Sequence, residues 1–127
     1  MDRHEPLITE LRARVSRGSF FQRLTGSDAL DVTGATVEAR ALLIAALQDK
    51  HHRRTAIVMP GDAAVADYEN ALRLFHRQPD CISIYPAPTL SPYQEIGPSL
   101  GIVREEIRAL GMLLDSSSDV LVVPARA

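Results

Sequence analysis

The chain has 127 residues, of which 46% are hydrophobic and 5% aromatic, and this favours one globular unit with an aliphatic core. Its formal net charge of -2 lacks the basic character of a nucleic-acid-binding domain, so we do not expect this chain to bind DNA by itself. No apolar run reaches the ~20 residues that span a bilayer, and no signal region opens the chain. We therefore expect a cytoplasmic protein with no membrane partner.

The first predicted element is a helix over residues 3 to 16, which ends near Gly18. Its buried stripe is predicted to consist of Leu7, Ile8, Leu11 and Val15. A short apolar anchor follows, formed by Phe20, Phe21 and Leu24. We assign residues 1–24 to an N-terminal helical appendage and residues 25–127 to an α/β domain.

The next segment has the pattern of the first strand, loop and helix of a phosphate-loop domain, with a strand at 29–33 and a helix at 36–48 capped by Thr36. A working phosphate loop reads G-x-x-x-x-G-K-[ST], because its glycines and lysine hold the phosphates and its hydroxyl holds magnesium. The four defining positions here carry Asp31, Thr36, Val37 and Glu38. The sequence therefore predicts a P-loop/helicase-like layer with a degenerate phosphate loop and no cofactor. An ordinary strand-to-helix turn is the alternative.

A basic run with two adjacent histidines, residues 50–54, separates this helix from the next strand. We interpret it as a solvated loop, and a nucleic-acid patch or a metal site is the alternative. The continuous apolar run at 55–59 predicts a strand of a parallel sheet, covered on both faces. Asp62 is a candidate cap for the helix that follows, whose apolar face would be Val65, Tyr68, Leu72 and Phe75. The preceding helix would bury Val37, Ala41, Leu43, Ile44 and Leu47.

The third predicted strand, residues 81–85, contains the only cysteine, Cys81, which is expected to be a buried small hydrophobe rather than a nucleophile. A proline-rich connection at 86–99 then leaves the carboxyl end of this strand, where function is usually located in open α/β sheets. It lacks the residue types needed for an acid/base pair or a metal site. We expect it to be an interface, with candidate contact residues Leu90, Tyr93, Gln94 and Ile96. Alternatively, Tyr93 and Ile96 pack onto the core of this domain.

A helix is predicted from about Leu100, followed by a last strand at 119–123. The side of this helix that faces the sheet is predicted to be the stripe Val103, Ile107, Leu110 and Leu114. Strand and helix alternation predicts an α/β fold with a parallel sheet and helices on both faces. Because the chain stops soon after its last strand, we expect it to be a fragment of a longer protein.

Four segments together resemble the start of a bacterial transcription-repair coupling factor (Mfd). In chain order these are Val32-Thr33-Gly34, Ile57-Val58-Met59-Pro60, Tyr85 to Glu95 and Val120 to Pro124. The most specific part is Leu90-Ser91-Pro92-Tyr93-Gln94-Glu95, followed by a helix that carries arginine and leucine. The resemblance covers about residues 20 to 127.

This resemblance implies the first domain of a module similar to the excision-repair protein UvrB, without a functional nucleotide motif. The parent would be an ATP-dependent DNA translocase that displaces stalled RNA polymerase and recruits nucleotide excision repair through UvrA. ATP, magnesium and DNA would then be bound by the rest of the parent chain, and this fragment would be a non-catalytic scaffold. UvrB itself is less similar, because it keeps an intact phosphate loop.

Two other functions are alternatives. One is a nucleotide-binding enzyme domain with an atypical phosphate loop, in which Arg40 replaces the lysine. The other is a receiver-like α/β signalling domain, which would need clustered carboxylates at the strand ends. The predicted strands instead end in Thr33, Met59, Tyr85 and Val123.

Overall fold

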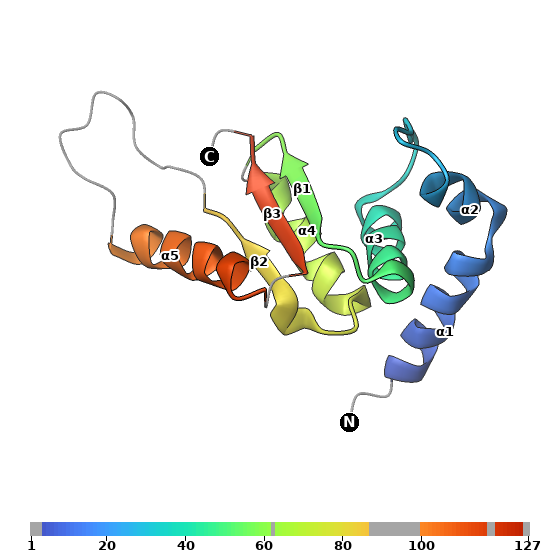
Figure 1. The fold of residues 1–127 in the computed structure, drawn as a ribbon, viewed down its shortest axis with the longest axis horizontal. Helices are drawn as coiled ribbons and strands as arrows, with labels where there is room; N and C mark the ends of the chain where they lie inside the picture. The colour runs from blue at the N-terminus through green and yellow to red at the C-terminus, as the bar shows by residue number, and fades with distance from the viewer. Residues whose placement is uncertain (1–3, 62, 87–99, 117–118, 126–127) are drawn as a thin grey trace.

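A computed structural model describes residues 4–61, 63–86, 100–116 and 119–125 of the chain (Figure 1). Three short strands form its centre, and helices lie around them. In chain order the elements are α1 (Glu5–Arg17), α2 (Ser19–Thr25), α3 (Val37–His51), β1 (Thr55–Met59), α4 (Ala63–Phe75), the 3-10 turn η1 (Pro79–Cys81), β2 (Ile82–Ile84), α5 (Leu100–Leu114) and β3 (Val120–Pro124).

The three strands form one parallel sheet in the order β1-β3-β2, so the last strand in the sequence lies in the middle. Thr55 of β1 and Ile82 of β2 both pair with Val120 of β3. The α/β class and the parallel sheet predicted from the sequence are thus confirmed, as are strands close to residues 55–59 and 119–123.

The strand predicted at 29–33 is wrong, because this segment is irregular and exposed and Leu30 keeps 39% of its surface accessible. Asp31 disfavours a strand at the centre of this five-residue segment, and its short apolar run finds no partner strand among the described residues. Gly34 takes a positive φ of 77°, and the hydroxyl of Thr36 accepts a hydrogen bond from the Ala39 N–H at 3.2 Å. The predicted N-cap at Thr36 is therefore confirmed, although no strand precedes it.

One face of the sheet is buried against α3 and α4. Because paired residues in a parallel sheet point to the same side, Ile57, Ile82 and Val122 share this face. The buried core comprises Ala41, Met59, Tyr68, Ala71, Leu72, Ile82, Val120 and Val122. Helix α3 buries Ala41, as predicted, together with Ala45 and Ala46, whereas the larger predicted residues Val37, Leu43, Ile44 and Leu47 are half-buried.

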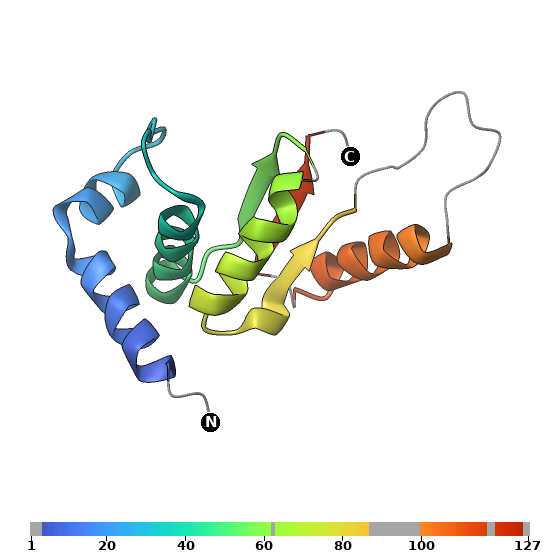
Figure 2. The ribbon, with the colours of Figure 1, turned by 180° about the vertical axis from the view of Figure 1, so that it is seen from behind.

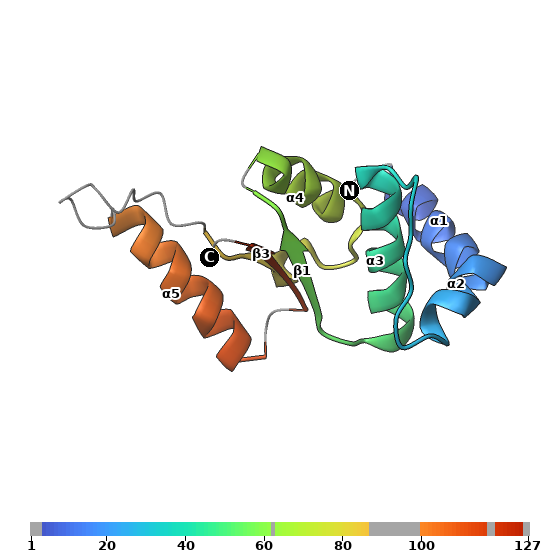
Figure 3. The same cartoon turned by 90° about the horizontal axis from the view of Figure 1, so that it is seen from above.

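On the opposite face, α5 covers β2, and Leu121 and Val123 of β3 are half-buried. Ser83 points to this side, is 3% exposed and donates a hydrogen bond to Met112 Sδ of α5 at 3.7 Å. On β1, at the opposite edge of the sheet, Ala56 is exposed and Val58 keeps 69% of its surface accessible. The prediction that residues 55–59 are covered on both faces is therefore wrong. Figure 3 shows α4 and α5 on opposite sides of the strands.

Helices α1 and α2 lie next to α3, on the side of the molecule away from α5 (Figure 2). The apolar stripe predicted for α1 is correct only in part, because Ile8 and Val15 are half-buried whereas Leu7 and Leu11 are exposed. The residue of α1 that is buried is Arg12, 6% exposed. Its Nε lies 2.8 Å from Asp49 Oδ2 of α3, and its Nη1 donates to the Phe75 carbonyl of α4 at 2.6 Å.

Helix α5 also presents a different face from the one predicted. Ala109 is buried at 2% exposure, whereas Ile107, Leu110 and Leu114 are exposed. The side of α5 that contacts β2 thus carries Ala109 and Met112. The larger apolar residues Ile107, Leu110 and Leu114 are not covered by any described residue. In the described part of the chain, no helix has the length and apolar content needed to cross a membrane.

Candidate interaction site

The interface residues proposed from the sequence, Leu90, Tyr93, Gln94 and Ile96, lie outside the described residues. Pro86, the last described residue before them, lines a cavity of about 320 Å³ between α4 and α5. We call this cavity the α4–α5 cleft. It is lined by Glu69 and Arg73 of α4, Ile82, Ser83, Ile84 and Pro86 at β2, and Glu105, Arg108, Ala109 and Met112 of α5.

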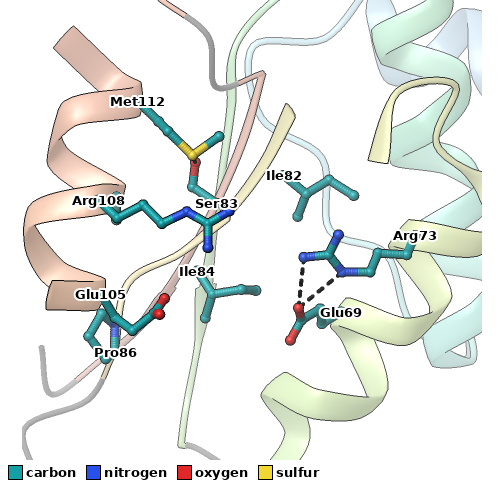
Figure 4. Close-up of a pocket in the computed structure, with 10 residues that line it drawn as sticks. Glu69, Arg73, Ile82, Ser83, Ile84, Pro86, Glu105, Arg108 and Met112 are labelled. Atoms are coloured by element: carbon teal, nitrogen blue, oxygen red, sulfur yellow. Dashed lines mark hydrogen bonds and ion pairs between the residues drawn. The ribbon is translucent and has the colours of Figure 1, made fainter. Parts of the chain in front are cut away.

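Figure 4 shows the two helices as opposite walls, with β2 between them. The α4 wall carries an ion pair, since Glu69 Oε1 lies 3.0 Å from both Nε and Nη2 of Arg73. The spacing of four residues along a helix brings such side chains together. Arg73 Nη1 also donates to the Pro79 carbonyl at 3.4 Å, so this guanidinium is held against η1.

The α5 wall carries Glu105 and Arg108, whose side chains are drawn on the side of α5 that faces the cleft (Figure 4). Both residues are exposed, and no ion pair joins either of them to another residue in the described part of the chain. The cleft therefore offers one carboxylate and one guanidinium that a bound molecule could pair with. Below these charges the surface is closed by the side chains of Ile82 and Ala109, which are buried.

The segment predicted to be a degenerate phosphate loop shows no feature that would replace the missing lysine. The Thr36 hydroxyl is used as the helix cap, and Glu38 places a negative charge in the first turn of α3, which would repel a phosphate. Burial raises the pKa of the Tyr68 phenol. The positive charge of the exposed Arg40 opposes this shift but does not cancel it.

The basic run at 50–54 is exposed, as predicted, but only residues 52–54 lie in a loop, because Lys50 and His51 belong to the last turn of α3. Two of its members contact the appendage: the His51 ring stacks on Phe21 with 6.3 Å between centroids, and Lys50 Nζ lies 5.4 Å from the same ring. In the described residues no group of three potential ligands could hold a metal ion. The run therefore serves as part of the support for α2.

Cys81 is half-buried rather than fully buried, and its thiol donates to Gln78 Oε1 at 3.5 Å. Burial and then the carboxylate of Asp119 raise the pKa of this thiol. A raised pKa keeps the sulfur protonated near neutral pH, and a thiol is a weak nucleophile. This agrees with the interpretation that Cys81 does not act as a nucleophile.

Sequence reasoning missed the cleft because it treated the charges of each helix separately. The sequence pattern assigned only an apolar stripe to α5, and it did not bring Glu105 and Arg108 opposite Glu69 and Arg73. The only available signal was the i,i+4 spacing of the α4 pair, which is common on solvated helices.

Among the described residues the cleft combines backbone, two acids and two arginines with a small apolar floor. Such a surface can hold a polar or mixed chain segment by hydrogen bonds and ion pairs. No protein-family model, no curated protein and no solved structure matches this chain.

Proposed function

We propose that this chain is a non-catalytic scaffold domain of a transcription-repair coupling factor. Its partners would be the rest of the parent chain and, through that chain, RNA polymerase, UvrA and DNA. ATP and magnesium would be bound elsewhere in the parent, whose motor would translocate on DNA and remove stalled polymerase. The proposal rests on the resemblance of Leu90 to Glu95 and of Val120 to Pro124 to that family.

The observation that carries a scaffold function is the amount of apolar surface outside the core. Val58 on the open face of β1 is 69% exposed, and Leu114 on α5 is 85% exposed. Ile107 and Leu110 extend the exposed stripe of α5 at helical spacing. An exposed apolar stripe such as that on α5 is typical of sites of contact between proteins or domains. A domain that packs against neighbours in a larger protein would cover it.

The test is reconstitution with a coupling factor that lacks its first α/β domain. We expect the chain to form a 1:1 complex with it, measured by analytical ultracentrifugation. Val58→Glu would place a charge in the contact and should abolish the complex. Leu74→Glu is the matched control, because Leu74 is also exposed, at 55%, but lies on α4.

Calorimetric titration with Mg-ATP tests the non-catalytic part of the proposal. We expect no saturable heat, because no residue supplies the lysine or the magnesium hydroxyl of a phosphate loop. A 1:1 isotherm that Arg40→Ala abolishes would instead favour a nucleotide-binding domain. Absence of the complex in the reconstitution would contradict the scaffold proposal.

A further inference from the structure

The floor of the α4–α5 cleft is the outer edge of the sheet. Among the described strands β2 lies at an edge of the sheet, and its other side pairs with β3. The Cys81 carbonyl accepts from Asp119 N–H at 2.9 Å, and Tyr85 N–H donates to the Val122 carbonyl at 2.8 Å. Successive residues of a strand turn their backbone groups to opposite sides, so Ile82 and Ile84 turn theirs away from β3.

These outward groups are open to a further strand. The Ile82 N–H is used within η1, where it donates to the Pro79 carbonyl. The carbonyl of Ile82 and both backbone groups of Ile84 have no strand partner among the described residues. An unpaired sheet edge is a template for another extended segment. Because the side chains of Ile82 and Ser83 are buried, what the edge presents to the cleft is mainly backbone.

The shape of the cleft selects an extended segment over a helix. A helix is about 10 Å wide and satisfies its own backbone groups, so it would leave the edge of β2 unpaired. A strand lies about 4.8 Å from its neighbour and pairs through its backbone. Its alternate side chains would point toward α4 and toward α5, where Glu105 and Arg108 lack an ion pair within the described residues.

We propose that the α4–α5 cleft binds an extended polypeptide segment of a partner protein, which adds to β2 as a fourth strand. The partner accepts a hydrogen bond from the Ile84 N–H and donates to the carbonyls of Ile82 and Ile84. On its α5 side it carries charged side chains that pair with Glu105 and Arg108. This mode of recognition takes affinity from the backbone and specificity from alternate side chains. It does not depend on the repair function proposed above.

The experiment uses the whole chain and a fluorescein-labelled nonapeptide in which valine alternates with lysine and glutamate. We expect saturable binding by fluorescence anisotropy, and slower hydrogen exchange of the Ile84 amide when the peptide is bound. Two further peptides are N-methylated, one at its odd-numbered residues and the other at its even-numbered residues. Each peptide therefore lacks the N–H groups along one edge of the strand that it would form. The peptide that loses the edge facing β2 should bind roughly tenfold more weakly or worse.

Two protein variants with the same charge change distinguish peptide binding in the cleft from binding elsewhere on α5. Arg108→Glu, in the cleft, should weaken binding at least roughly fivefold, about 1 kcal/mol. Arg104→Glu lies on the same helix but outside the cleft lining, and should change affinity less than about twofold.

Three results would overturn the proposal. The first is no saturable binding at millimolar peptide. The second is equal binding of both N-methylated peptides and the parent peptide. The third is an Ile84 amide already protected in the free chain, since another part of the chain would then pair with β2.

Discussion

The helices at the two ends of the molecule are attached in different ways. On the N-terminal side, Arg12 of α1 and Phe21 of α2 are both buried, and each reaches the C-terminal half of α3. On the C-terminal side, α5 touches β2 through Ala109 and Met112 and leaves Leu110 and Leu114 exposed. The comparison shows that a helix is not always held by its most apolar face. The available partner decides which face is buried.

The first way to break the N-terminal attachment is Phe21→Ala. Phe21 is 1% exposed, and its ring contacts both the His51 ring and the Lys50 ammonium. Removing a buried aromatic side chain costs about 3 to 5 kcal/mol. We expect a loss in this range in urea unfolding, together with faster proteolysis at α2. Phe20→Ala is the control, since Phe20 is 44% exposed and should change stability by less than about 1 kcal/mol. Equal losses in both variants would contradict the anchor role of Phe21.

The second is Arg12→Met, which keeps an unbranched apolar stem but removes the guanidinium and its charge. Asp49 and the Phe75 carbonyl would lose their donor. Breaking a buried ion pair costs about 3 to 5 kcal/mol, and we expect the lower end, about 3 kcal/mol, because Asp49 is partly exposed. Arg14→Met removes only the exposed pair with Glu10 and should cost less than about 1 kcal/mol in the same unfolding experiment. A result near zero for Arg12→Met would mean that α1 is not held by this residue.

The third concerns pH at the junction between these helices and α4. His76 is 7% exposed, its Nδ1 accepts from the Gln78 N–H at 3.0 Å, and its Nε2 has no partner in the described residues. Burial lowers the pKa of His76 below its ordinary value of 6.5. The Gln78 carbonyl and the carboxylates of Asp119 and Asp49 oppose this shift, and Arg12 adds to it.

Because the folded state disfavours the protonated ring, His76 contributes stability above pH 6.5, and this is lost as the pH falls through the lowered pKa. The midpoint of thermal unfolding should therefore fall more steeply below pH 6.5 in the natural chain than in His76→Gln. His52→Gln, at an exposed position, should follow the natural chain. Parallel curves for all three proteins would show that His76 does not contribute.

The smallest effect is expected on the outer stripe of α5. Leu114 is 85% exposed, so Leu114→Gln should change the free energy of unfolding by less than about 0.5 kcal/mol. Ala109→Asp, on the buried side of the same helix, would place a charge where none can be solvated and should cost about 2 kcal/mol or more. If Leu114→Gln were more destabilising than Ala109→Asp in urea unfolding, α5 would be held by its leucine side and not by Ala109.

The sequence predicted those features that depend on local chemistry. The apolar runs of β1 and β3, the cap at Thr36 and the helix end at Gly18 follow from side-chain type and neighbouring residues, and all are present. The segment at 29–33 failed because a strand needs a partner in the sheet, which a short apolar run cannot specify.

The faces of the helices were less predictable. Periodicity identifies an apolar stripe but not what lies opposite to it. Half of the stripe predicted for α1 and most of the stripe predicted for α5 are therefore exposed. Arg12 would be placed on a solvated face by any pattern of hydropathy, yet Asp49 and the Phe75 carbonyl make its burial favourable. The cleft was missed for a similar reason, since it exists only where α4 and α5 approach β2 together.

The position of β3 in the middle of the sheet also sets the order of folding. β1 and β2 do not pair with each other, and each is held by β3. During synthesis the helices α1 to α4 emerge long before residue 120, and they can form local contacts early. The sheet must wait for the last strand, and pairing between residues so distant in sequence is slow. A nascent chain that pauses before β3 therefore carries two unpaired strands, and this is the interval in which it most needs protection from aggregation.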